Sequence, residues 1–287
     1  MRIILAILMG WNRHIWIDLL GNAPMRAYGK LVGGAAKLIV PRGLRQPLFR
    51  HISRNLGIDP TEAEHPLGEY SSLGELFVRR LKAGARLIDE ARNSIVSPVD
   101  GCVSGFGTAS GEWLIQAKGI QYTIGELLGS DELAKRLEGG TYMTLYLRPK
   151  DYHRIHAPVA ANIIAARRIP GGFFPVQPWV VRNLKGLFVR NERLILEMDS
   201  DLGKVALVCV GAAGVGSITT LFNTGEREGL YDLSVELTKG DELAAFNLGS
   251  TVIVIFERGN IVLEPLVNGQ EIRVGQVLAH SVCNEVV

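Results

Sequence analysis

The sequence lacks several features that would assign it to a protein class at once. Its 287 residues include only three cysteines (Cys102, Cys209 and Cys283), and no two of them form a CxxC pair. This scarcity excludes a disulfide scaffold and favours reduced thiols in a cytoplasmic compartment. No stretch reaches the roughly 18–20 apolar residues of a membrane-spanning helix, although the mean hydropathy is +0.17. With 47% hydrophobic residues, the chain is neither collagen-like nor intrinsically disordered.

Acidic residues are almost missing from the first part of the chain. Residues 1–58 contain nine Lys/Arg and one acid, Asp18, and carry a charge of +8, whereas residues 59–287 carry −6. Arginines recur among Leu, Phe and Ile over 41–58, which is typical of short helices lying on an anionic membrane surface. We therefore expect 1–58 to be a basic, amphipathic, membrane-associating helical region. Helices that only pack on the body are the alternative; the sequence shows no nucleic-acid-binding motif.

A βαβ alternation is absent from the rest of the chain, which argues against a doubly wound parallel sheet. Two capping boxes, SLGE at 72–75 and TIGE at 123–126, predict helices, and the second helix is expected to reach about Leu137. Most of the remainder predicts strands between Gly, Pro or Asp turns. The expected strands are 95–96, 101–106, 113–117, 142–147, 163–169, 194–198, 204–210, 217–221, 234–237, 251–256 and 277–280. The fold class is therefore α+β, with one β-rich catalytic domain at 59–287 after the N-terminal helices.

Two polar segments carry side chains suited to catalysis or metal binding. SPVDG (97–101) contains Asp100 in a turn, and RPKDYHRIHAP (148–158) contains His153 and His156, two of only six histidines. If the second segment forms a helical turn, its two histidines face the same way. Together with Asp100 they would then suit a metal site, as in a metallohydrolase, or a His–Asp general-base pair.

Two glycine-containing segments precede expected strands. In FNLGST (246–251), Gly249 leaves its carbonyl unshielded, so that a neighbouring hydroxyl such as that of Ser250 can reach it. No GxSxG motif surrounds Ser250, so an α/β-hydrolase is not indicated. GAAGVGS, which contains Gly214 and Ser217, has GxxGxG spacing without a βαβ unit, and therefore predicts tight strand packing or a substrate-facing turn.

Seven segments in order along the chain resemble one enzyme family. They are EYSSLGELFVRRLK (69–82), SPVDG (97–101), LIQAKGIQYTIGELL (114–128), RPKDYHRIHAPV (148–159), RNERL (190–194), VGAAGVGSI (210–218) and KGDELAAFNLGSTVIVIF (239–256). The set is similar to the pyruvoyl-dependent phosphatidylserine decarboxylases, in their longer bacterial form with an LGST processing site. DYHRIHAPV together with FNLGSTV is the most specific part of the match.

The resemblance implies that the chain cuts itself. At the positions that match the family motifs, Asp100, His156 and Ser250 form a serine-protease-like triad. In such a triad the histidine takes the proton of the serine hydroxyl, while the aspartate orients and stabilises the imidazolium. Ser250 would attack the carbonyl of Gly249 and give an ester.

Elimination from that ester would divide the chain into 1–249 and 250–287 and release ammonia. Residue 250 would remain as a covalent pyruvoyl cofactor, whose ketone supplies the electron sink for decarboxylation. The family chemistry then implies a Schiff base with the amine of phosphatidylserine, loss of the carboxylate and release of phosphatidylethanolamine. His153 is expected to position the carboxylate or return the proton.

The resemblance also implies where the protein works and what it meets. It is expected at the cell membrane, as a peripheral protein on the cytoplasmic side. Its partners would be phosphatidylserine in anionic membranes, each cleavage piece for the other, and a second copy in a homodimer, but not nucleic acid. Expected substrate contacts are Phe173, Phe174, Gly214 and Ser217, although an apolar core cluster equally explains the two phenylalanines. The competing hypothesis is a non-enzymatic, membrane-associated β-domain in which LGST is merely a turn.

Overall fold

The computed structural model describes residues 27, 31–117, 120–212, 218–222, 228–246, 250–259 and 261–281. Residues 31–36 are helical, and the helices with bounds inside the described residues are α4 (Arg42–Leu56), α5 (Leu73–Phe77), α6 (Ile124–Leu128), α7 (Asp131–Arg136), α8 (Pro178–Val181) and α9 (Leu187–Arg190). Its strands are β1 (Ser94–Val96), β2 (Gly101–Thr108), β3 (Trp113–Ala117), β4 (Ile120–Thr123), β5 (Thr141–Leu147), β6 (Arg154–His156), β7 (Ala161–Ile169), β8 (Arg193–Ser200), β9 (Gly203–Val210), β10 (Ile218–Thr220), β11 (Gly229–Leu237), β12 (Glu242–Phe246), β13 (Ser250–Phe256), β14 (Ile261–Leu263), β15 (Glu271–Ile272) and β16 (Val277–Ser281).

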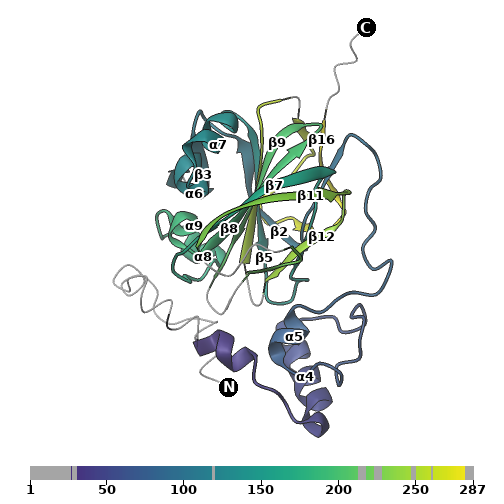
Figure 1. Cartoon of the computed structure of the whole chain (residues 1–287). Helices are drawn as coiled ribbons and strands as arrows, with labels where there is room; N and C mark the ends of the chain where they lie inside the picture. Colours follow the sequence, from purple (N-terminus) through teal and green to yellow (C-terminus); the bar gives the residue numbers. More distant parts are fainter. Residues whose placement is uncertain are drawn as a thin grey trace.

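An eight-stranded antiparallel sheet forms the centre of the fold. Its strand order is β11-β7-β8-β9-β13-β5-β2-β15, and smaller sheets β1-β16-β14, β10-β12-β6 and β3-β4 complete the architecture. In Figure 1 the helices α6 to α9 lie on one side of the large sheet, while α4 and α5 lie together at one end of the molecule. The prediction of a β-rich domain with some helices is confirmed.

Strand β13 occupies the interior of the large sheet because of its composition. Every residue of STVIVIF is buried, and the strand pairs with β5 on one side and β9 on the other. An uninterrupted run of β-branched residues suits a strand that is covered on both faces. The start of this strand is therefore sealed inside the protein.

The second predicted helix is wrong in its length. The capping box is present, since the Thr123 hydroxyl accepts from the Glu126 amide and the Glu126 carboxylate accepts from the Thr123 amide. The helix nevertheless ends at Gly129, whose φ of 59° places it in the left-handed region and terminates α6. Ser130 then caps a separate helix, α7. A glycine stop followed at once by a serine start divides the expected single helix in two.

The N-terminal helices are described only from residue 31, apart from residue 27. Helix α4 packs its buried Phe49 against Tyr70 and Leu76 of the segment around α5. The expected helices in residues 1–26 and 28–30 lie outside the described residues. Within the described part of the chain, no helix is long and apolar enough to cross a membrane.

Candidate active site

Ser250 is the first residue of β13 and is completely buried. It pairs with Leu147 of β5, and the next residue, Thr251, pairs with Val210 of β9. Its hydroxyl has no hydrogen-bond partner among the described residues. Buried hydroxyls are nearly always satisfied, so an unpaired one marks a position where the structure is not optimised for stability alone. We therefore take the Ser250 hydroxyl as the candidate nucleophile of the LGST motif.

His153 lies at the same end of β5 as Ser250. Its Nε2 is 3.0 Å from the carbonyl oxygen of Arg148, the residue after Leu147. A carbonyl can only accept, so Nε2 carries the proton and Nδ1, which is buried and unpaired, keeps a lone pair. Burial lowers the pKa of His153 to about 3, and the nearby Arg79 charge acts in the same direction. His153 is therefore a neutral imidazole with an unused acceptor.

His156 ends the short strand β6 and is also held as a neutral imidazole. Its Nδ1 is 2.7 Å from the Gly240 carbonyl oxygen and therefore carries the proton. Its Nε2 accepts a hydrogen bond from the hydroxyl of Tyr152, 3.2 Å away. Burial lowers the pKa of His156 and raises that of Tyr152 to about 12. A proton on Nδ1 with an accepting Nε2 is the arrangement that a general base toward a hydroxyl requires.

The helical turn that would make His153 and His156 face the same way is not present in the described segment 148–158. Residues Arg154–His156 form strand β6, which pairs with β12. Side chains alternate along a strand, so two histidines three residues apart do not share a face as they would on a helix. Among the described residues, no group of three His, Cys, Asp or Glu could hold a metal ion. The described part of the chain therefore offers no ligand set for the metallohydrolase hypothesis.

Asp100 lies beside β6 but is not hydrogen-bonded to His156. The Pro98 carbonyl accepts a hydrogen bond of 2.8 Å from the His156 amide, which places the SPVDG turn against the histidine strand. Asp100 is buried, with its side chain 9% exposed, and its carboxylate accepts instead from the Arg86 guanidinium and from the Val274 amide at 2.9 Å. Asp100 and His156 therefore lie on adjacent segments, but each is hydrogen-bonded to other groups: Asp100 to Arg86 and Val274, and His156 to Gly240 and Tyr152.

The remaining predicted positions divide into two groups. Phe173 and Phe174 are buried, and Phe174 belongs to the main hydrophobic core. Their role as substrate contacts stays a prediction. Gly214, Ser217 and Gly249 lie outside the described residues.

Sequence reasoning missed Asn191 as a support for this site. Asn191 is fully buried, and its side chain accepts from the Phe174 amide and donates to the carbonyls of Phe174 and Gly211. Gly211 follows Val210, the partner of Thr251, so Asn191 holds the chain next to Ser250 in the sheet. RNERL (190–194) is among the segments that resemble the family, but the sequence pattern assigned Asn191 no role, because its partners Phe174 and Gly211 are distant along the chain.

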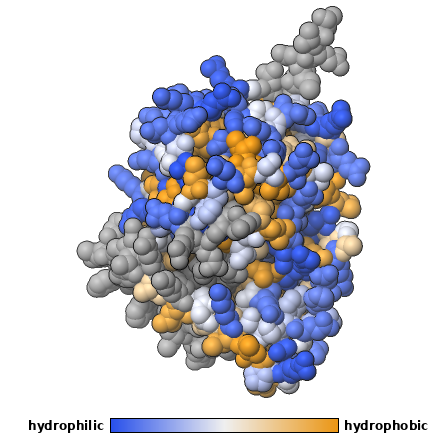
Figure 2. All heavy atoms as spheres, viewed as in Figure 1, coloured by the Kyte–Doolittle hydropathy of each residue, from blue (hydrophilic) through white to orange (hydrophobic). Residues whose placement is uncertain are grey.

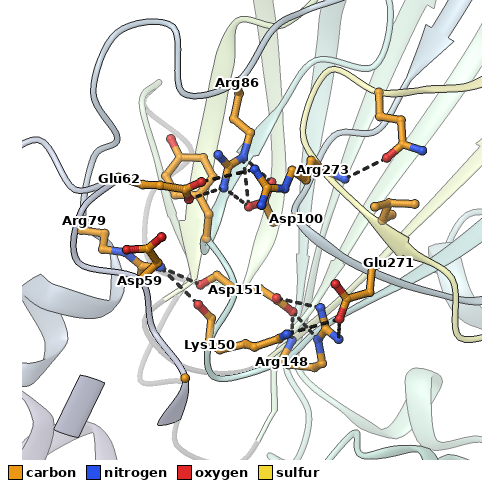
Figure 3. A pocket seen from close by; sticks show the side chains of 14 residues that line it. Asp59, Glu62, Arg79, Arg86, Asp100, Arg148, Lys150, Asp151, Glu271 and Arg273 are labelled. Carbon is orange, nitrogen blue, oxygen red and sulfur yellow. Dashed lines mark hydrogen bonds and ion pairs between the residues drawn. The ribbon is translucent and has the colours of Figure 1, made fainter. Parts of the chain in front are cut away.

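A charged cavity of about 290 Å³ adjoins the site. Figure 3 shows side chains from the N-terminal part, from the segment after β5 and from the segment around β15 facing one another across it. Tyr152 and Asp100 both line the cavity, so it reaches the hydroxyl that donates to His156 and the candidate acid on the adjacent turn. Its ten charged lining residues are Asp59, Glu62, Arg79, Arg86, Asp100, Arg148, Lys150, Asp151, Glu271 and Arg273.

These features define a β-rich protein whose candidate reactive group is a serine of its own chain, buried at the start of a central strand. The family model described as phosphatidylserine decarboxylase matches residues 73–280. The chain belongs to the phosphatidylserine decarboxylase family, as the ordered motifs predicted.

Similar proteins extend this match over nearly the whole chain. A phosphatidylserine decarboxylase proenzyme of Anaeromyxobacter sp. (strain K) is 40% identical over 93% of this chain and 98% of its own length. Those of Myxococcus xanthus and Acinetobacter baylyi are 41% and 40% identical, over 86% and 94% of this chain and 90% and 96% of their own lengths. The similarity therefore includes part of the N-terminal region as well as the β-rich domain.

Proposed function

We propose that this chain cuts itself before Ser250 and then decarboxylates phosphatidylserine to phosphatidylethanolamine, with Asp100, His156 and Ser250 performing the cut. The observation that carries the proposal is the buried hydroxyl of Ser250, which has no partner among the described residues. Family membership supplies the reaction class. The neutral state of His156, with Nε2 as acceptor, supports its assignment as the base.

The first step replaces one hydrogen bond by another. Nε2 of His156 exchanges the Tyr152 hydroxyl for that of Ser250 and takes its proton, while the Gly240 carbonyl keeps the ring oriented through Nδ1. The negative charge of Asp100, on the adjacent turn, stabilises the imidazolium. The Ser250 oxygen bonds to the carbonyl carbon of Gly249, and the C–N bond of that peptide breaks. The amide becomes an ester, and His156 returns the proton to the freed amine.

The second step opens the chain. Removal of the Cα proton of residue 250 expels the Gly249 carboxylate, which becomes the new end of the piece 1–249. Water then displaces ammonia from the resulting unsaturated residue and leaves a keto group at the head of 250–287. That keto group supplies an electron sink for loss of a carboxylate from the bound amino acid headgroup.

The residues around Ser250 fit such a group. Ser250 is completely buried. A site that excludes bulk water would favour decarboxylation, because the carboxylate loses its hydration there, neutral carbon dioxide departs, and the electron pair of the broken C–C bond remains in the electron sink. His153 presents the unpaired Nδ1 at this end of the sheet. We assign to His153 the positioning of the substrate carboxylate or the return of a proton to the product.

The N-terminal region, taken as residues 1–58 before a catalytic domain at 59–287, supports the proposal of a membrane location. Arg42, Arg50 and Arg54 of α4 are exposed, and so are the nearby apolar side chains Leu38 and Ile39, which are 69% and 76% exposed. Figure 2 shows apolar atoms interspersed with hydrophilic ones at the end of the molecule where α4 and α5 lie. Exposed apolar and basic side chains together suit an anionic lipid surface. The protein is proposed to act there as a peripheral protein on the cytoplasmic side.

A homodimer is a further part of the proposal. Strand β11 lies at one edge of the large sheet, and its Leu230 is 54% exposed. The other exposed positions of β11 are Asp232, Ser234 and Glu236, so the support for pairing with a second copy is the length of the edge strand together with Leu230. Light scattering of the purified protein across a concentration series tests this part separately.

The self-cleavage is tested by intact mass. The purified wild-type chain is expected as two pieces, of which the smaller has 38 residues and is blocked to Edman degradation. Borohydride reduction in the presence of phosphatidylserine should add the mass of the lipid to that piece. Ser250→Ala should remain a single chain. A full-length, unmodified wild-type chain after prolonged expression would refute the proposal and favour a β-domain without enzymatic activity.

A further inference from the structure

Arg86 lies between two acids, and one of them is the candidate triad acid. Its Nε is 2.9 Å and 3.1 Å from the two carboxylate oxygens of Asp100, and its Nη2 bonds both Asp100 and, at 2.8 Å, Glu62. Its Nη1 donates to the carbonyl of Ala85 at 2.6 Å. The guanidinium is therefore fixed by three separate partners, and the Arg86 side chain is only 10% exposed.

The carboxylate of Asp100 is correspondingly restrained. One of its oxygens also accepts from the backbone amide of Val274 at 2.9 Å. A fork of two N–H groups fixes the plane of a carboxylate as well as its position. Because Asp100 follows the turn whose Pro98 carbonyl accepts from the His156 amide, fixing this plane also fixes how the carboxylate faces the histidine strand.

Glu62 completes the arrangement from the N-terminal side. It accepts from Arg86 and pairs with Arg273 at 3.2 Å, so that Asp100, Arg86, Glu62 and Arg273 alternate in charge across the cavity (Figure 3). The single positive charge of Arg86 is shared between the carboxylates of Asp100 and Glu62. Removing Arg86 would make the surroundings of Asp100 more negative, whereas removing the charge of Glu62 would make them less negative.

We propose that Arg86 is a positioning residue for self-cleavage, which holds the Asp100 carboxylate in its working orientation and, with Glu62 as counter-charge, sets the negative potential that Asp100 exerts on His156. This inference rests on the proposed function, because it assigns Arg86 a role in the cut before Ser250. Arg86 acts through Asp100 and does not itself touch the reacting atoms.

The inference has a definite pH signature. The charged groups that act on His156 are Asp100 and Glu242, which are negative, and Arg154, which is positive; Tyr152 faces it as a neutral hydroxyl. Cleavage needs neutral His156, so the rate falls at low pH as this side chain takes up a proton. Loss of the Arg86 charge should move that fall to higher pH, because an imidazolium near uncompensated carboxylates holds its proton more tightly. Loss of the Glu62 charge should move it to lower pH.

The test follows cleavage of newly made chain rather than enzyme that is already processed. Each full-length variant is synthesised in a cell-free extract with a short pulse of labelled methionine, and the uncut chain is followed on denaturing gels from pH 5 to pH 9. Arg86→Gln is expected to cleave at least about tenfold more slowly at pH 7. Its acidic limb should lie about half a pH unit higher. Arg86→Lys should recover part of the rate, and Glu62→Gln should shift the limb downward.

Two controls separate this inference from its foundation. Arg136→Gln removes an ion pair with Glu257, 3.6 Å apart and remote from the site, and should cleave like wild type. Asp100→Asn should remain uncut; if it cleaves normally, the proposed triad fails, whatever Arg86 does. If Asp100→Asn is uncut but Arg86→Gln has the wild-type rate and pH profile, only the role of Arg86 is refuted. If Arg86→Gln does not fold, Arg86→Lys and Glu62→Gln decide, and an unshifted acidic limb in Glu62→Gln overturns the inference.

Discussion

Gly101 lies so close to Tyr146 that a Cβ on residue 101 would be 2.3 Å from the Tyr146 carbonyl oxygen. The glycine follows Asp100 directly and begins β2, whose next residue, Cys102, pairs with Tyr146. The approach brings the Asp100 turn against the strand that pairs with β13. A residue that looks like an ordinary turn glycine therefore sets the distance between the candidate acid and the sheet that carries the nucleophile.

Gly101→Ala should consequently destabilise the protein by about 2 kcal/mol or more, because the obstacle is backbone and cannot rotate away. Self-cleavage should slow as well, since Asp100 must shift with its neighbour. Urea unfolding in a Ser250→Ala background measures the stability of a single uncut chain. Gly105→Ala, on the same strand β2, is the matched control. A Cβ on residue 105 would meet no atom closer than 3.8 Å. Equal stabilities for the two alanine variants would contradict this explanation.

Substitution of His156 and of His153 should affect different reactions, self-cleavage and decarboxylation respectively. His156→Ala should leave the chain uncut, because no base remains to take the Ser250 proton. His153→Ala should still cut but should lose decarboxylation by about 100-fold or more, the usual contribution of a positioned acid or base. Intact mass reports the cut, and release of labelled carbon dioxide from phosphatidylserine reports the second reaction. Normal cleavage in His156→Ala would remove that residue from the proposed triad.

Acid should destabilise the fold through His153. Its pKa is about 3 in the folded protein, against an ordinary value of 6.5, so between these values the unfolded chain binds a proton that the native chain does not. Stability therefore falls as the pH drops below 6.5. Between pH 7 and pH 5 this contribution is about 2 kcal/mol.

His153→Gln should remove that contribution, so its urea midpoint should change less between pH 7 and pH 5 than that of the parent. Both chains should carry Ser250→Ala to keep them uncut. His156, whose pKa burial also lowers, adds a fall of the same sign that remains in the variant. An unchanged pH dependence in His153→Gln would show that His153 does not stay neutral in the folded protein.

Reversal of the exposed arginines of α4 should weaken membrane binding. Arg42→Glu, Arg50→Glu and Arg54→Glu together should reduce affinity for phosphatidylserine-containing vesicles at least about 100-fold, since each basic residue near an anionic surface contributes about 1 kcal/mol. Cosedimentation at several salt concentrations measures this. Lys135→Glu with Arg136→Glu, on α7, is the control and should bind like wild type. Equal losses in both sets would indicate a general charge effect rather than docking by α4.

The sequence predicted those parts of the fold that depend on local patterns. The strand 113–117 has the expected bounds, and the expected strand at 251–256 is found one residue longer because its apolar run is continuous. Strand β6 was missed because a polar–apolar–polar triplet is too short to establish an alternating pattern; its pairing with β12 makes it a strand. Tertiary pairing overrides local propensity in such short elements.

The site shows the same division. The family resemblance of ordered local motifs nominated Asp100, His156 and Ser250, and their catalytic roles stay predictions. The contacts of Arg86 with Asp100, 14 residues away, and of Asn191 with Gly211, 20 residues away, depend on how loops meet after folding. No spacing in the sequence encodes them. The partners of Asp100 and His156 had to come from the structure.

The position of β13 in the large sheet affects how the protein would refold before and after self-cleavage. The segment after residue 249 supplies β13 to the middle of the large sheet, β15 to its edge, and β14 and β16 to a second sheet. Before the cut, all of these strands find their partners within one chain, and folding does not depend on concentration. After the proposed cut before Ser250, the same strands would belong to a separate short peptide, so a denatured mature molecule could refold only by association of two chains. The uncut precursor can therefore fold as a single chain, whereas refolding of the cut enzyme would depend on the concentration of both pieces.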